Sequence, residues 1–307
     1  MRLIASAIAI MLLVSQNTAQ AQGKNTAERL GYPRDSKLLI IHADDLAVAH
    51  SEDAASFDAL DKRAATSASI MVPCPWLTEV AEYAKAHPDA DLGLHLTLTS
   101  EWKTYRWAPV ASKDRVPSLL DSSGYLWPDS DPAKQHIKAD EAEREIRAQM
   151  EKAISMGIHP THIDSHMGVL FSRPDLFAAY VRVAHEFKLP FLAVRTADAP
   201  PALLSLLSDR DVVLDSIVMA SPDVKPGDWK TFYLNAIKNL KSGVTEFIVH
   251  LGYDDAELRA VTVDHPDYGS AWRQRDYDVI TSPEFKKALD DNHVILIRWA
   301  DIKKLLG

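Results

Sequence analysis

Short apolar runs alternate along the chain with longer segments in which apolar residues recur at helical spacing. The apolar runs predict strands at 38–43, 67–72, 92–99, 161–165, 191–195, 212–216, 244–250 and 293–298. Helices are predicted between them, at 52–64, 77–87, 139–156, 174–187, 228–240 and 283–291. Ser282 is expected to cap the last helix, with Pro283 at its first position. Several strands are apolar throughout, as is typical of a sheet that helices cover.

The alternation of strand and helix predicts an α/β protein built on a parallel (β/α) barrel of about seven or eight strands. A doubly wound open sheet is the alternative, because periodicity does not show whether a sheet closes. No repeat, linker or low-complexity tract divides residues 37–307, so we expect a single domain there.

One insertion, over 100–136, interrupts this alternation and carries three of the seven Trp residues. Long loops in compact domains are usually functional or disordered, and the aromatic content argues against disorder. A wall of rings suits a sugar-like ligand, which makes Trp102 and Trp107 candidate substrate contacts. Equally, the rings can simply pack the insertion onto the barrel.

The N-terminus has the pattern of a secretory signal peptide over 1–21. It combines a basic Arg2, an uncharged apolar run over 3–14 and a small-residue cleavage site ending at Ala21. The run is shorter than the ~20 residues of a membrane-spanning helix, so a retained anchor is the less favoured alternative. We expect a loose polar arm over 22–36 and a periplasmic or secreted bacterial protein, with no stable membrane insertion after cleavage.

Composition excludes several classes of function. The 307 residues include 34 basic and 43 acidic side chains, for a formal charge of −9 and no basic stripe, so a nucleic acid is not an expected partner. The single Cys74 excludes an internal disulfide. The number of His residues, 12, is unusual, and several of them lie at strand ends.

An acidic pair, Asp44 and Asp45, ends the strand predicted at 38–43. Side chains alternate along a strand, so both carboxylates face one cavity only if the chain breaks into a loop there. In a β/α barrel the C-terminal rim of the strands is where active sites form. Alone, such a pair is often only a helix N-cap.

Two further strands bring imidazoles to the same rim. Over 92–98 the Leu residues face one side, while His95 faces the other beside Gly93, which leaves room next to it. His250 ends the strand predicted at 244–250 and shares a face with Glu246.

The strongest local signal is the segment 162–166. Period two places His162, Asp164 and His166 on one face of a strand. Three polar side chains on one face of a buried strand would be costly without a partner. Imidazole and carboxylate are common metal ligands, and an Asp beside a liganding His often orients that His, the role expected of Asp164.

Together, the strand ends deliver five ionisable side chains to one rim: Asp44, Asp45, His95, His166 and His250. One carboxylate with two imidazoles forms an open site for a divalent metal, with positions left for water and substrate. A second Asp can act as base on the water, and a further His can protonate the leaving group.

With these residues in place, the sequence resembles the YdjC/ChbG (HpnK-related) carbohydrate deacetylase family over about 37–299. The resemblance rests on separated segments that agree in order, spacing and residue identity, at 39–45, 66–72, 93–96, 161–166, 250–254 and 273–285. It implies a distorted β/α barrel that removes acetyl groups from N-acetylated amino sugars with a divalent metal, Zn or Mg. The implied partner is therefore an acetylated sugar.

The same resemblance implies roles for the rim residues. It implies Asp45, His95 and His166 as metal ligands, Asp44 as general base, and His250 as the acid that protonates the departing amine. Two imidazole ligands favour Zn or another late transition metal.

The chain departs from the family pattern at three places. Gly168 stands where members usually have a second His, and Leu251 stands where Pro is usual. Leu46 and Ala47 replace the usual Phe-Gly, so a turn that needs a positive φ is expected to be strained at Ala47.

Several interpretations stay open. The same scaffold would also suit a non-catalytic periplasmic carbohydrate-binding protein or a metal-dependent esterase. Arg195 ends a predicted strand and is expected either to bind substrate or to pair with Glu246. His42 and His162 are interpreted as core residues, and Arg273 as lining the rim or pairing with a carboxylate.

Overall fold

The computed structural model describes residues 25–194, 203, 205–208 and 210–306. Within these residues the centre of the fold is one parallel sheet of seven strands, in the spatial order β4-β3-β2-β1-β6-β5, with β7 paired to β1. The strands are β1 (Lys37–Leu46), β2 (Ser67–Ile70), β3 (Leu92–Leu96), β4 (Ile163–Ser165), β5 (Ser216–Met219), β6 (Gly243–His250) and β7 (Val294–Leu296).

Strand β1 is the axis of the sheet. It pairs with β6 from Lys37 opposite Gly243 to Asp44 opposite His250. On its other side, β7 pairs with the first part of β1 and β2 with the last part. Because every pairing is parallel, the C-terminal ends of β1, β3, β4 and β6 reach the same rim, as the sequence predicts.

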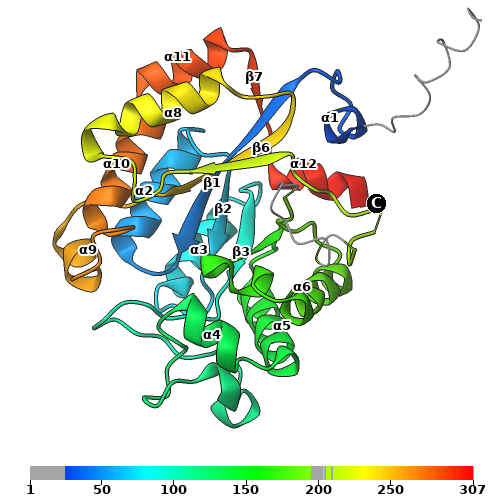
Figure 1. Ribbon diagram of the computed structural model, residues 1–307. Helices are drawn as coiled ribbons and strands as arrows, with labels where there is room; N and C mark the ends of the chain where they lie inside the picture. Colours follow the sequence, from blue (N-terminus) through cyan, green and yellow to red (C-terminus); the bar gives the residue numbers. More distant parts are fainter. Residues whose placement is uncertain (1–24, 195–202, 204, 209, 307) are drawn as a thin grey trace, which may run out of the picture.

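Helices cover the outside of the curled sheet (Figure 1), with α5 packed on α6 and α8 on α11. The longer helices are α2 (His50–Asp61), α3 (Leu77–Ala86), α5 (Ala139–Ser155), α6 (Pro174–Phe187), α8 (Trp229–Lys238), α10 (Ser270–Ile280) and α11 (Pro283–Asp291). The shorter ones are α1 (Thr26–Arg29), α4 (Ser130–His136), α9 (Ala256–Val261) and α12 (Trp299–Lys303). The 3-10 segments are η1 (Lys113–Arg115), η2 (Pro117–Leu119), η3 (His166–Phe171), η4 (Pro226–Asp228) and η5 (Lys304–Leu306). The predicted distorted (β/α) barrel is confirmed, and Ser282 caps α11 by accepting a hydrogen bond from the Phe285 amide.

Two strand predictions differ from the structure. The segment predicted at 191–195 forms only isolated bridges, at Phe191 and Val194, and Arg195 lies outside the described residues. The strand predicted at 212–216 shares only Ser216 with β5, which runs from Ser216 to Met219. Val212 is buried without belonging to a named strand, because an apolar run signals burial and not the register of pairing.

The N-terminal arm is more ordered than predicted. Asn25 caps α1 through a reciprocal capping box with Glu28, and Ala27 is fully buried in an apolar cluster with Leu38 and Trp299. The arm predicted over 22–36 thus includes a capped helical turn at 25–30, while the predicted signal peptide lies outside the described residues. Among the helices of the described chain, none combines the length and apolar character that crossing a membrane requires.

The aromatic insertion is packed from within. Trp102 and Trp107 are 2% and 3% exposed and meet edge to face, with ring centroids 5.9 Å apart. The indole N–H of Trp107 donates to the carbonyl of Thr99 at 2.7 Å. This burial favours the packing alternative for Trp107.

The turn after β1 carries the strain that the sequence leads us to expect. Ala47 has a φ of 77°, in the left-handed region that favours glycine. Its amide donates to the Asp53 carboxylate at 2.6 Å, which helps to hold this conformation. Asp53 is itself fully buried.

The interior of the barrel is tightly packed at Gly93. A Cβ at this position would lie 2.4 Å from the ring of His162. We expect Gly93→Ala to lower the free energy of unfolding by about 1–3 kcal/mol, as overpacked core substitutions do, in urea denaturation. Gly227→Ala, where a Cβ meets nothing within 4 Å, is the matched control and should change it by less than about 0.5 kcal/mol. Wild-type stability of Gly93→Ala would show that His162 can move aside.

Candidate metal centre and active site

The two carboxylates at the end of β1 face one cavity because the strand is irregular there. The register between β1 and β2 shifts between Ala43 and Leu46, and Asp45 has a φ of 73°. Such an irregularity turns consecutive side chains, which would otherwise diverge, toward the same side. A bulge within β1 thus replaces the predicted loop, and Asp44 and Asp45 both line the cavity.

Asp45, His95 and His166 direct their ligand atoms at one point. Asp45 Oδ1 lies 3.4 Å from His95 Nε2 and 3.3 Å from His166 Nδ1. One ligand atom from each residue lies within 4.8 Å of the others. The three residues come from β1, β3 and the start of η3 directly after β4, so the fold brings the predicted ligands together.

The surroundings of these residues are strongly negative. Glu101 lies 3.1 Å from His166 Nε2, and Asp44 Oδ2 lies 3.7 Å from His95 Nε2. Burial alone would lower the pKa of His166, but Glu101 and Asp45 raise that pKa to about 10. Asp44 and the carboxylate behind His95 likewise raise the pKa of His95 against burial. A site that holds protons this strongly also attracts a divalent cation, which displaces them on binding.

The donor set fits such a cation. Asp45 Oδ1 is buried and has no hydrogen-bond partner among the described residues. Its contacts are ion pairs of 3.4 and 3.3 Å with His95 and His166, and a metal ion bound between the three residues would satisfy this buried oxygen directly. One carboxylate oxygen with two imidazole nitrogens is a ligand set that zinc and other late transition metals accept, with positions left open.

Arg273 of α10 holds the other oxygen of Asp45. Its Nη2 donates to Asp45 Oδ2 at 2.7 Å, and its Nε lies 3.0 Å from Glu52 Oε1. Burial would raise the pKa of Asp45, but Arg273, followed by His166, holds it well below its usual range. Asp45 is therefore a charged carboxylate of fixed orientation, and Arg273 both lines the cavity and pairs with carboxylates.

Asp164 contacts the ring nitrogen of His95 that points away from the cavity. Its Oδ1 lies 2.5 Å from His95 Nδ1, which leaves His95 Nε2 to face the cavity. Burial would raise the pKa of Asp164, but the charge of His95 and a hydrogen bond from His42 lower it. This is the arrangement expected of Asp164. His162, expected on the same face, is buried against Gly93 and does not line the cavity.

His250 ends β6 opposite Asp44. Its Nε2 lies 4.0 Å from Asp44 Oδ2 and 4.0 Å from Asp45 Oδ2. Its amide donates to Asp276 Oδ2 at 2.9 Å, which fixes the end of the strand. Burial lowers the pKa of His250 to about 4, with Asp45 opposing this effect. A proton placed on this imidazole is therefore readily given up to a base.

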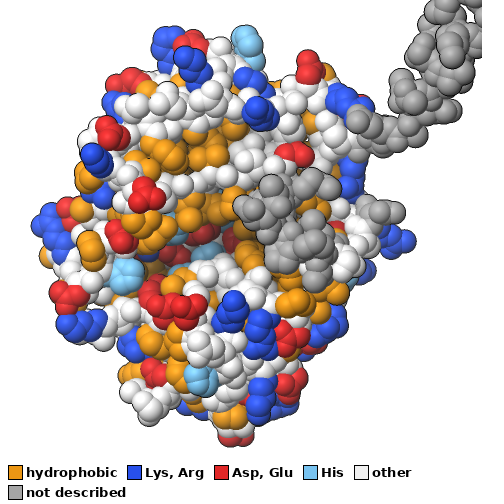
Figure 2. All heavy atoms as spheres, in the orientation of Figure 1, with side chains coloured by type: hydrophobic (Ala, Val, Ile, Leu, Met, Phe, Trp, Pro, Cys, Tyr) orange, Lys and Arg blue, Asp and Glu red, His pale blue; other side chains and the backbone are white. Residues whose placement is uncertain are grey.

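These residues line a cavity of about 370 Å³, within the size range of small-molecule sites. Figure 2 shows a hollow in this face in which acidic and histidine side chains are visible, bordered by hydrophobic ones. Trp102 lines the cavity, whereas Trp107 is not among its lining residues. Gly168, where the family usually has a second His, lies in its wall with a φ of 65°.

Three carboxylates that contact residues of the site were not predicted from the sequence. Glu101 lies in the irregular insertion, and Glu52 lies on α2. Neither has a pattern that marks it, because their partners are distant in sequence. Asp276 lies in the 273–285 segment of the family resemblance, which was the one available signal.

Arg273 is the buried cation that pairs with Asp45 and Glu52. Arg273→Met removes the cation from Asp45 and Glu52, which are 3% and 0% exposed, and should lower the free energy of unfolding by about 3–5 kcal/mol. The control, Arg147→Met, breaks partly exposed pairs with Glu143 and Glu186 and should cost less than about 1 kcal/mol. Urea unfolding of both variants makes the comparison. A small effect for Arg273→Met would contradict its role as the neutralising cation.

Several known proteins are similar to this chain over most of its length. The sequence profile of the family described as YdjC-like protein matches residues 38–291. A carbohydrate deacetylase of Thermus thermophilus is 30% identical over 285 residues, which covers 91% of this chain and 98% of that protein. A chitooligosaccharide deacetylase of Yersinia enterocolitica is 24% identical and covers 83% of this chain and 94% of that protein.

A solved structure extends the likeness to the fold. The crystal structure of a protein from Enterococcus faecalis has a TM-score of 0.73 at 24% identity, and the match covers 86% of this chain and 98% of that one. Because the family profile spans most of the chain and the Thermus relative aligns over nearly its full length, this chain belongs to the YdjC-like protein family.

Proposed function

We propose that this chain is a carbohydrate deacetylase, a hydrolase that removes acetyl groups from N-acetylated amino sugars. Relatives that align over most of its length are named carbohydrate deacetylase and chitooligosaccharide deacetylase. The observation that carries the proposal is the convergence of a carboxylate pair and three imidazoles on one cavity. A protein that only binds sugar has no use for a general base there, which disfavours the non-catalytic alternative.

Asp45, His95 and His166 are the residues that would hold the metal. A divalent metal bound there would polarise the acetamide carbonyl and lower the pKa of a water molecule. We propose zinc ahead of magnesium, because two of the three ligands are imidazoles. Asp164 and Arg273 keep His95 and Asp45 oriented toward that position.

Asp44 is positioned to accept the proton of the attacking water. Its Oδ1 accepts a hydrogen bond from Ser69 Oγ at 3.2 Å, while Oδ2 faces His95 and His250. As the water oxygen bonds to the carbonyl carbon, Asp44 Oδ2 takes the water proton.

His250 is positioned to return a proton to the leaving group. The amide nitrogen must be protonated before the C–N bond breaks, and His250 Nε2 lies 4.0 Å from Asp44 Oδ2. A proton passed to this weakly basic imidazole is donated to the nitrogen, and acetate and the free amine leave.

The test of this mechanism separates metal binding from catalysis. Asp44→Asn should keep the metal and lower acetate release from a panel of N-acetylated sugars by about 10²–10⁴-fold, because an amide does not accept the water proton. Metal content and acetate are measured on the same preparation.

Asp291→Asn, which alters an exposed ion pair with Lys287, is the matched control and should keep full activity. Full activity of Asp44→Asn would contradict the assigned base. Loss of the metal together with activity would make Asp44 a ligand instead.

We also propose that the protein is exported to the periplasm and that residues 1–21 are removed. The basic start, the short apolar run and the small-residue site at Ala21 support this. The intact mass of protein recovered from the periplasm of a bacterial host should correspond to a chain beginning at Gln22. A chain that keeps residues 1–21, or that stays in the cytoplasm, would contradict the proposal.

A further inference from the structure

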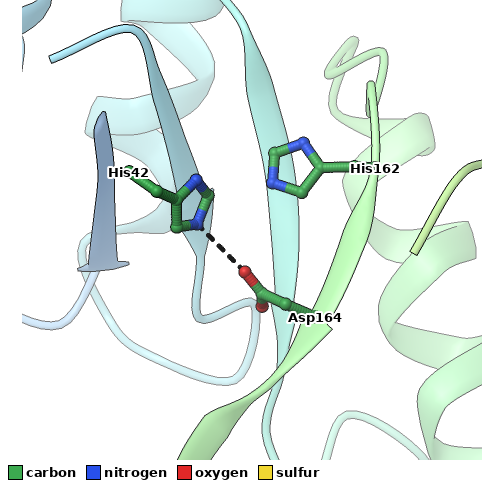
Figure 3. A group of neighbouring side chains, drawn as sticks. All are labelled: His42, His162 and Asp164. Carbon is green, nitrogen blue, oxygen red and sulfur yellow. Dashed lines mark hydrogen bonds and ion pairs between the residues drawn. The ribbon is translucent and has the colours of Figure 1, made fainter. Parts of the chain in front are cut away.

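His42 is a buried imidazole to which the proposed reaction gives no role. Its Nε2 lies 3.0 Å from Asp44 Oδ1, 3.0 Å from Asp164 Oδ2 and 3.1 Å from Ser69 Oγ. Figure 3 shows the side chains of His42 on β1 and Asp164 on β4 pointing toward each other. One nitrogen atom thus contacts both the proposed general base and the carboxylate that orients His95.

A second layer of contacts fixes the ring of His42. It meets His162 edge to face at 5.0 Å, and His162 stacks on the indole of Trp299 at 5.1 Å. The indole N–H of Trp299 donates to Glu246 Oε1 at 2.7 Å, and this oxygen lies 3.7 Å from His42 Nδ1. Each of these four residues contacts the next, so that the contacts form a closed circuit, and none is more than 1% exposed: His42, His162, Trp299 and Glu246.

This circuit restricts the ring of His42 in a way that simple core filling does not require. Burying polar groups is costly unless they are partnered, and an apolar side chain would fill the same space without that cost. Because Nε2 contacts Asp44 and Asp164 together, a rotation of the ring would break both contacts at once. A donor shared between two carboxylate oxygens ties the positions of the two carboxylates to each other.

We propose that His42 is a positioning residue that couples the general base to the metal centre. Through Nε2 it holds Asp44 Oδ1, which leaves Oδ2 toward the cavity. Through Asp164 it holds the ring of His95 toward the metal position. The inference rests on the proposed deacetylase function for its kinetic part and on the ligand set alone for its metal-binding part.

The experiment compares two substitutions of His42. His42→Phe keeps a ring in the core and removes Nε2. At saturating zinc we expect kcat to fall about 10–100-fold while KM changes by less than about threefold, because base orientation acts on the transition state and not on substrate binding. Zinc affinity, measured by competition with a chromophoric chelator, should weaken by about 10–100-fold. His42→Gln retains a donor and should recover part of both losses.

The control is His185→Phe, at a partly exposed histidine that pairs with Asp211 and does not line the cavity. It should leave kcat, KM and zinc affinity unchanged. If His42→Phe does not fold, Trp299→Phe provides the second variant, because it keeps a ring against His162 and removes the hydrogen bond to Glu246. It should lower kcat without raising KM.

The possible results distinguish the positioning role of His42 from the proposed deacetylase function. Wild-type kcat and zinc affinity in His42→Phe would overturn the positioning role, and so would a uniform rise in KM with kcat unchanged. If the wild-type chain binds zinc but releases no acetate, the proposed function fails, while the zinc affinities of the His42 variants still decide whether His42 organises the metal centre.

Discussion

Several carboxylates are buried close together, and the rest of this structure depends on how their negative charges are paired. Asp44, Asp45, Asp164 and Glu246 are all buried at or beneath the rim of the sheet. Buried charges of like sign are unfavourable unless each is paired and hydrogen-bonded. The surrounding cations and donors answer this need, namely Arg273, His42, His95, His166, Ser69 and Trp299. Asp45 Oδ1, which accepts no hydrogen bond from the described residues, lies at the point where the ligand atoms converge.

The fold meets this constraint by bringing distant segments together. Parallel strands align their C-terminal ends, so residues from four strands share one rim. A bulge in β1 then turns Asp44 and Asp45 to the same side, at the cost of a positive φ at Asp45. Helix α10 adds Arg273, and the start of α12 adds Trp299, so the last part of the chain completes a site that β1 begins.

The sequence predicts this architecture well where local pattern determines it. Strand periodicity places His95, Asp164 and His250 correctly, because alternation on a strand decides which face a side chain takes. It does not predict the bulge, since irregular backbone leaves no periodic signal. It also does not predict the start of β5, since Val212 and Leu214 are buried without being part of that strand. The contacts of Arg273 with Asp45 and Glu52 join residues far apart in sequence, and no local pattern encodes such pairings. For the aromatic insertion, composition left ligand contact and packing equally open, and the burial of Trp107 favours packing.

The central claim is that one divalent ion binds between Asp45, His95 and His166. The most direct measurement is an anomalous difference map from a crystal of the zinc-loaded protein, collected at the zinc absorption edge. We expect a single strong peak that lies between Asp45 Oδ1, His95 Nε2 and His166 Nδ1. A peak centred instead between Asp44 and Asp164, or the absence of any peak in this cavity at saturating zinc, would contradict it.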